Sequence, residues 1–68
     1  MRYDYVYSVS MTPTEDTYLY DVYRFDGEHV EGVTLTLTDV RRMYPTCMNE
    51  GEALIWLNAN AARAFSSE

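Results

Sequence analysis

The chain contains one histidine and one cysteine, the residue types with the most potential for nucleophilic or acid–base chemistry. His29 stands next to Glu28 in a predicted turn, and Cys47 lies just beyond Pro45. A cysteine nucleophile requires a base within hydrogen-bonding reach and a third group that orients this base, and nothing in the spacing supplies that arrangement. We therefore predict that the protein is not an enzyme and has no catalytic residues.

Metal and cofactor motifs are also missing from the sequence. One histidine, one cysteine and scattered carboxylates do not reproduce the ligand spacing of a zinc site or a calcium loop. The three glycines form neither a GxGxxG pattern nor a Walker loop that would hold phosphate groups. We expect no metal and no cofactor.

Carboxylates are concentrated in one segment of the chain. Eleven Asp and Glu residues against five Arg residues give a formal net charge of −6, and six of these acids lie between residues 15 and 31 beside a single arginine. Such a segment repels nucleic-acid phosphates and anionic membranes and attracts basic surfaces. We expect a basic host protein as partner, with no direct nucleic-acid binding and no membrane binding. The alternative is that the charge only keeps a small domain soluble.

Aromatic residues accompany the acids, and tyrosine and tryptophan are enriched at protein interfaces. Trp56 is predicted to be exposed, because a helical projection places it opposite Leu54 and Phe65. The tyrosines could instead form the core, or stack on single-stranded bases, but base stacking also requires a positive groove that these acidic strands lack. The predicted partner-binding residues are Asp16, Tyr18, Tyr20, Asp21, Asp26, Glu28, Glu31 and Trp56.

Alternation of apolar and polar residues predicts three strands that would position these side chains. The first covers residues 3–11, the second covers residues 17–25, and the third runs from Val30 to Leu37. A turn at residues 26–29, with glycine at its second position, predicts a hairpin between the second and third strands.

Two helices are predicted after the strands. The first is short, with Thr38 or Asp39 as its N-cap, and it ends at Pro45. The second begins at Asn49, which precedes Glu52 by three residues as in a capping box, and it runs to Phe65. An alternative is that residues 53–57 form a fourth strand, because a five-residue apolar run does not distinguish the two structures.

These elements predict one compact α+β domain over residues 1–68. The expected fold is a small antiparallel three-stranded β-sheet (β-β-β) followed by a short helix and a longer C-terminal helix, packed on one face. The sequence contains no apolar run of about 18 residues for a membrane span and no signal-peptide core, so we expect a cytoplasmic protein. A chain of this size has little room for a deep catalytic cavity, which directs attention to its surface.

Small size, acidic charge and absent catalytic motifs favour a non-enzymatic, protein-binding inhibitor. The hypothesis is an inhibitor of the anti-CRISPR or anti-restriction type, encoded by a phage or mobile element, that blocks the nucleic-acid-binding surface of a host complex. The alternative is a self-assembling structural or accessory protein that uses its tyrosine-rich sheet edges or Trp56 as a homodimer interface. The two hypotheses differ in predicting a monomer or a homodimer.

Overall fold

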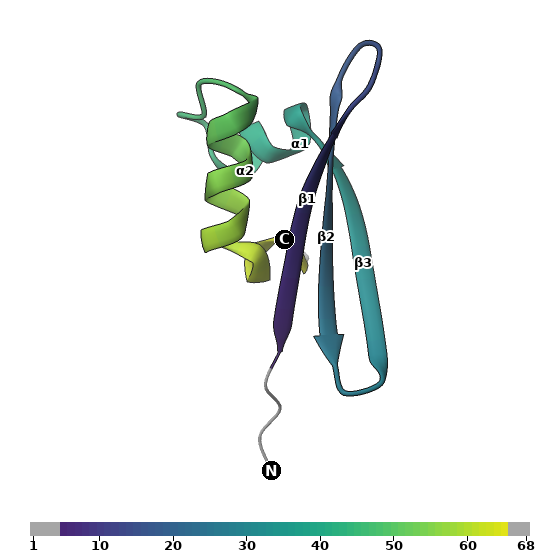
Figure 1. The fold of residues 1–68 in the computed structure, drawn as a ribbon. Helices are drawn as coiled ribbons and strands as arrows, with labels where there is room; N and C mark the ends of the chain where they lie inside the picture. Colours follow the sequence, from purple (N-terminus) through teal and green to yellow (C-terminus); the bar gives the residue numbers. More distant parts are fainter. Residues whose placement is uncertain (1–4, 66–68) are drawn as a thin grey trace.

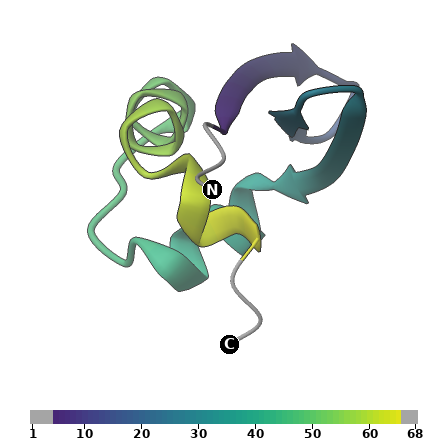
Figure 2. The same cartoon turned by 90° about the horizontal axis from the view of Figure 1, so that it is seen from below.

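The computed structural model describes residues 5–65, and its elements follow the predicted order (Figure 1). The elements are β1 (Val6–Pro13), β2 (Tyr18–Asp26), β3 (His29–Thr36), α1 (Leu37–Met43), α2 (Glu50–Ala59) and the 3-10 turn η1 (Ala61–Phe65). The strands form one antiparallel sheet in the order β1-β2-β3, and the helices lie together on one side of it (Figure 2). The predicted α+β fold is therefore confirmed.

Alternation along β1 sets which side of the sheet faces the helices. Tyr7, Val9 and Met11 are half-buried against the core, whereas Ser8 and Ser10 are exposed. We call the helix-covered side the inner face of the sheet and the other side its outer face. The first residues of the predicted strand, 3–4, lie outside the described part of the chain.

The centre of the core is built from one or two side chains each of β2, α1 and α2. Tyr20 and Val22 of β2, Val40 of α1, and Ala53 and Leu57 of α2 are all fully buried. The two fully buried residues of β2 both lie on the inner face. The core therefore joins the central strand to both helices.

The predicted hairpin turn between β2 and β3 is confirmed. Asp26 pairs with His29 across the turn, and Gly27 has a φ of 64° while Glu28 keeps an ordinary negative φ. Positive φ at the first central residue alone is the type II′ geometry, which matches the twist of the two strands and favours glycine at that place.

Replacement of Gly27 by alanine is expected to lower the free energy of unfolding by about 1 kcal/mol, because an alanine side chain is strained at positive φ. The measurement is urea unfolding followed by circular dichroism. Glu28→Ala in the same turn is the control, since residue 28 has ordinary backbone geometry, and its stability should stay close to that of the wild type. Equal losses in both variants would contradict the role assigned to Gly27.

The first helix begins earlier than predicted. Thr36 is the N-cap, and its hydroxyl accepts from the Asp39 backbone N–H at 3.2 Å while the Thr36 N–H donates to the Asp39 carboxylate at 2.9 Å. The prediction of Thr38 or Asp39 as N-cap was wrong because β3 enters the helix without a loop and Asp39 is the acid of a capping box. The helix stops at Met43, just before the predicted boundary at Pro45.

Asp39 gives the fold a testable pH dependence. Hydrogen bonds from the backbone N–H of Thr36 and then from its hydroxyl lower the pKa of Asp39 below its ordinary value of 3.8. A carboxyl with a lower pKa in the folded state stabilises the fold above its unfolded-state pKa, and this contribution disappears as the pH falls through the folded value. Because the Asp39 side chain is 34% exposed, the contribution should be under about 1 kcal/mol.

In urea unfolding at a series of pH values, wild type should therefore be more stable than Asp39→Asn above about pH 5, with a constant difference. The difference should shrink as the pH falls from 3.8 through the lower pKa of folded Asp39, since the carboxylate then loses its charge. Stability curves that remain parallel down to the lowest pH would show that the Asp39 charge does not stabilise the cap.

The second helix is confirmed, and the alternative of a fourth strand at residues 53–57 is wrong. Asn49 is the N-cap, as predicted, and its side chain accepts from the Glu52 N–H at 2.9 Å. The helix ends at Ala59 instead of Phe65, because the Asn60 side chain donates to the Trp56 carbonyl at 3.0 Å and the chain then tightens into η1. Asparagine competes for backbone groups in this way and favours helix ends.

Candidate functional site

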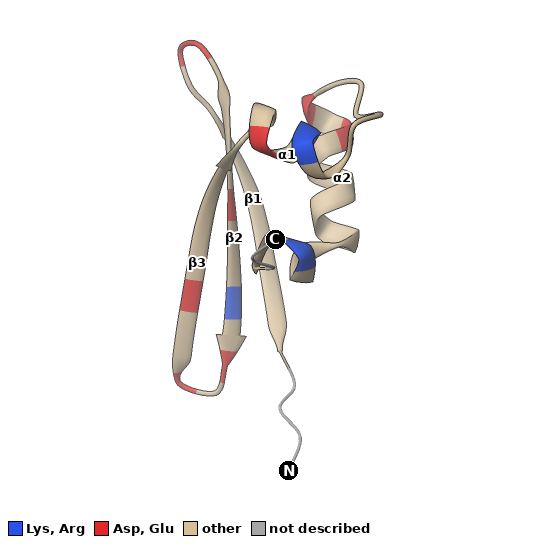
Figure 3. Cartoon of the chain, turned by 180° about the vertical axis from the view of Figure 1, so that it is seen from behind, with Lys and Arg blue, Asp and Glu red and all other residues tan. Residues whose placement is uncertain are grey.

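The acidic segment does not form one surface. Glu15 and Asp16 lie in the loop between β1 and β2, whereas Asp26 and Glu28 lie at the hairpin turn (Figure 3). The nine residues of β2 separate these two ends by roughly 26 Å, because an extended chain rises about 3.3 Å per residue. The acids that are close in sequence are therefore separated in space, and Asp16 is remote from the acids of the turn.

Two of the predicted contact tyrosines belong to the core side of the sheet. Tyr20 is fully buried, and its hydroxyl donates to the Glu50 carbonyl at 3.0 Å. Burial raises the pKa of Tyr20 above its ordinary value of 10.0. Tyr18 is half-buried on the same face and packs against the core. The prediction of Tyr20 as a contact residue was wrong, since its side chain has no exposed surface.

The carboxylate of Glu31 interacts with side chains of the protein itself. Its carboxylate accepts from the Arg24 guanidinium on the neighbouring strand, and its second oxygen lies 3.2 Å from the His29 ring. The Arg24 guanidinium carbon lies 4.8 Å from the centre of the Tyr5 ring and 5.1 Å from the centre of the Phe65 ring. Glu31 therefore neutralises an arginine that is held between aromatic rings, and it adds little to an acidic surface.

An exposed apolar row crosses the outer face near the hairpin turn. Val6, Phe25 and Val30 are opposite one another on β1, β2 and β3. Val6 is 61% exposed and Val30 is 53% exposed, and Tyr23, two residues before Phe25, is 40% exposed. The helices cover the other side of the sheet, and the turn extends beyond them (Figure 1). This row therefore faces away from the core.

Gly32 allows Tyr23 to lie flat over the neighbouring strand. The two residues are paired, and a Cβ atom built on Gly32 would lie 2.5 Å from the Tyr23 ring. An aromatic ring that covers a cross-strand glycine is a recognised way to protect the glycine backbone. Sequence analysis omitted Tyr23, Val6 and Val30 from the predicted contact residues, although their positions in the strand alternation place them opposite the core.

One carboxylate lies on the outer face two residues before Tyr23, and two more belong to the turn at the end of the row. Asp21 lies on the outer face, where its carboxylate accepts from the Thr34 hydroxyl at 2.7 Å, and Asp26 and Glu28 belong to the turn. Arg24, the one arginine of the described strands, lies on the inner face beside Glu31. We define the hairpin face as Val6, Asp21, Tyr23, Phe25, Asp26, Glu28 and Val30. It combines exposed apolar side chains with carboxylates that form no ion pair within residues 5–65.

Trp56 lies away from the hairpin face, on α2. Its ring stacks on the Tyr44 ring with 5.4 Å between ring centres and 9° between planes, and it is half-buried against the core. The prediction of an exposed tryptophan was wrong, because the chain before α2 brings Tyr44 over the indole. The predicted contact residues therefore do not meet in one place.

The groups with potential for covalent chemistry are also separated. His29 begins β3 at the hairpin turn, and Cys47 is buried in the connection between α1 and α2, at the other end of the sheet (Figure 1). Among residues 5–65, no three His, Cys, Asp or Glu side chains are close enough together to hold a metal ion. No helix in that range has the length and apolar character needed to cross a membrane.

Comparison with known proteins gives no relative: no family model, curated protein or solved structure matches the chain.

Proposed function

We propose that this protein is a non-enzymatic binding module that contacts a basic protein partner through the hairpin face. The observation that carries the proposal is the exposure of Val6, Tyr23 and Val30 on the outer face, away from the core and near the acids of the hairpin turn. Apolar centres with charged rims are typical of protein interfaces, and charge complementarity speeds association with an oppositely charged surface.

The partner class follows from the charges. Asp21, Asp26 and Glu28 present negative charge next to apolar side chains, so the complementary surface carries Arg or Lys around an apolar centre. Surfaces that bind DNA or RNA have this character, because they must neutralise phosphates. Occupation of such a surface by the hairpin face would exclude the nucleic acid. We therefore propose an inhibitor of host nucleic-acid-directed machinery, of the type that phages and mobile elements use against CRISPR or restriction systems.

Capture from host-cell extract with immobilised protein tests this function. We expect a nucleic-acid-binding partner that is released as salt rises, because salt screens contacts between exposed charges. Added DNA or RNA should compete with the hairpin face for the same surface and lower the amount captured. A partner that remains bound at all salt concentrations, and whose capture is insensitive to nucleic acid, would contradict the proposal.

Self-assembly is the second candidate function, and the open edges of the sheet favour it. Within the described residues β1 and β3 each pair with β2 alone, so each leaves one edge for addition of another strand. Light scattering separates the two candidates. The binding module is expected to have the 7.9 kDa mass of a monomer at micromolar concentration, whereas a doubled mass would favour the homodimer.

A further inference from the structure

The second helix is apolar on the side away from the sheet as well as on the side that packs against it. Ala53 and Leu57 are buried toward the core. On the other side Ile55 is 71% exposed, and Met48, just before the helix, is 74% exposed. Exposed apolar side chains that lie close together often mark a binding surface, so the outward side of α2 has the character of one.

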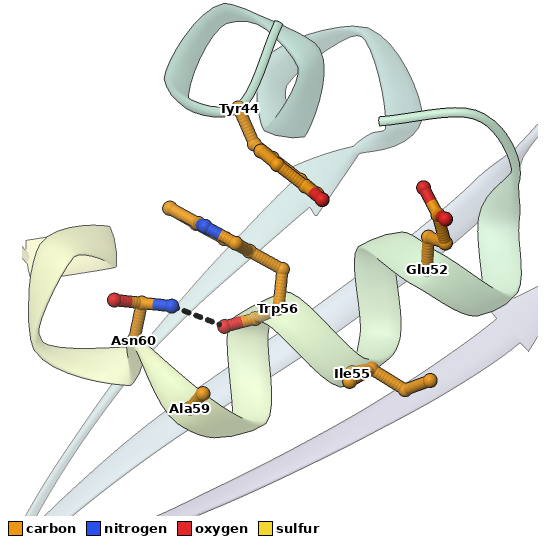
Figure 4. A pocket seen from close by; sticks show the side chains of 6 residues that line it. All are labelled: Tyr44, Glu52, Ile55, Trp56, Ala59 and Asn60. Carbon is orange, nitrogen blue, oxygen red and sulfur yellow. Dashed lines mark hydrogen bonds between the residues drawn. The ribbon is translucent and has the colours of Figure 1, made fainter. Parts of the chain in front are cut away.

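A hollow of about 340 Å³ opens on this outward side of α2 (Figure 4). The stacked rings of Tyr44 and Trp56 form one wall, and the other lining residues come from successive turns of the helix. The lining residues are Tyr44, Glu52, Ile55, Trp56, Ala59 and Asn60. The hollow is thus mainly apolar and aromatic, and it contains one charged group.

That charged group is a carboxylate held in a fixed position. One oxygen of Glu52, Oε1, accepts from the Met48 backbone N–H at 2.8 Å. Its other oxygen, Oε2, has no hydrogen-bond partner within residues 5–65, and no arginine in that range forms an ion pair with it. Within the described part of the chain, the hollow therefore presents a carboxylate without an ion-pair partner beside two aromatic rings.

We propose that this hollow binds an arginine side chain of a protein partner. A guanidinium is attracted to the faces of aromatic rings and donates to carboxylates, while its aliphatic stem packs on apolar side chains. The chain already holds one of its own arginines by this chemistry, since Arg24 lies over the rings of Tyr5 and Phe65 and pairs with Glu31. The hollow offers the same combination to an arginine from outside.

The proposed arginine site is independent of the hairpin face. The hollow lies on the helical side of the molecule, whereas the hairpin face lies on the outer side of the sheet, so the two surfaces can be tested separately (Figures 1 and 4). Loss of binding at one surface leaves the other unaffected. A contact at both surfaces would let a basic partner hold the molecule from two sides.

Trp56 is the only tryptophan of the chain, so its indole N–H resonance reports directly on the hollow. The probes are acetyl-Leu-Arg-Leu-amide and the same peptide with citrulline, which is neutral and of similar shape, in place of arginine. The arginine peptide should shift the indole resonance in a saturable manner. Its dissociation constant should be at least about threefold lower than that of the citrulline peptide, because cation–π attraction requires the charge.

Glu52→Gln supplies the matched variant, because its amide oxygen can still accept from the Met48 N–H while the charge is removed. The preference for arginine over citrulline should shrink in this variant. Glu50→Gln removes a charge from the same turn of the helix outside the hollow, and should keep the preference. These paired results separate a local carboxylate contact from the general attraction of an acidic protein for a cation.

Three outcomes would overturn the proposal. The first is equal affinity for the arginine and citrulline peptides, and the second is an indole resonance that neither peptide shifts at any accessible concentration. The third is an indole resonance that shifts with protein concentration alone, which would mean that a second copy of the chain fills the hollow.

Discussion

Replacement of Tyr20 by alanine is expected to leave a large fraction of the molecules unfolded at room temperature. The ring is fully buried, and its hydroxyl donates to the Glu50 carbonyl, so the change creates a cavity and removes a link between β2 and α2. Truncation of a buried aromatic ring costs about 3–5 kcal/mol. A domain of 68 residues has a total stability of roughly 3–10 kcal/mol, and its small core places it toward the lower end, which such a loss cancels.

Tyr23→Ala is the matched control, since it truncates the same residue type on the same strand but on the outer face. We expect a loss below about 1 kcal/mol, because the Tyr23 ring is 40% exposed and lies over Gly32 on the outer face. Urea unfolding followed by circular dichroism measures both variants. A folded Tyr20→Ala protein, or a Tyr23→Ala protein that unfolds as easily, would contradict the assignment of the two faces of β2.

Reversal of Asp26 and Glu28 to lysine is expected to weaken partner binding at least about tenfold, because attraction to a basic surface becomes repulsion. The two residues lie at the hairpin turn, away from the core, so the double variant should remain folded. Its affinity for the captured partner is measured at low salt by calorimetry or surface plasmon resonance. Circular dichroism of the same sample confirms that the fold is intact.

Reversal of Glu15 and Asp16 to lysine provides the control for net charge. It changes the charge by the same amount at the opposite end of β2, roughly 26 Å from the turn, in an exposed loop. If the hairpin face makes the contact, this variant should bind with close to wild-type affinity. Equal losses from both reversals would show that the overall charge matters and that its position does not.

The sheet and the order of elements could be predicted from sequence because each depends on local patterns. Alternation along residues 5–13 and in β3, the glycine of the turn, and Asn49 as a helix cap all specify backbone geometry within a few residues. The limits of the helices were harder to predict. Thr36 is both the last residue of β3 and the cap of α1, and Asn60 ends α2 within an alanine-rich segment that continues to Phe65.

The candidate contact surface was less predictable because β2 carries aromatic residues on both faces. Tyr20 and Tyr23 differ by three positions and so lie on opposite sides of the sheet, and residue type alone does not say which side the helices cover. That choice depends on packing of Leu57 and Val40 against Tyr20 and Val22. The positions of the acids in the sequence also did not predict their positions in the fold, because the extended strand β2 separates acids that are close along the chain.

Photocrosslinking identifies directly which surface of the protein contacts the partner. A benzophenone amino acid is placed at Val30, in the hairpin face, and in a second sample at Thr12, which is exposed on the outer face near the opposite end of β1. Each sample is irradiated with the captured partner and resolved by mass spectrometry. The account predicts a crosslink from position 30 and none from position 12. A crosslink from position 12 without one from position 30 would contradict the hairpin face as the binding surface.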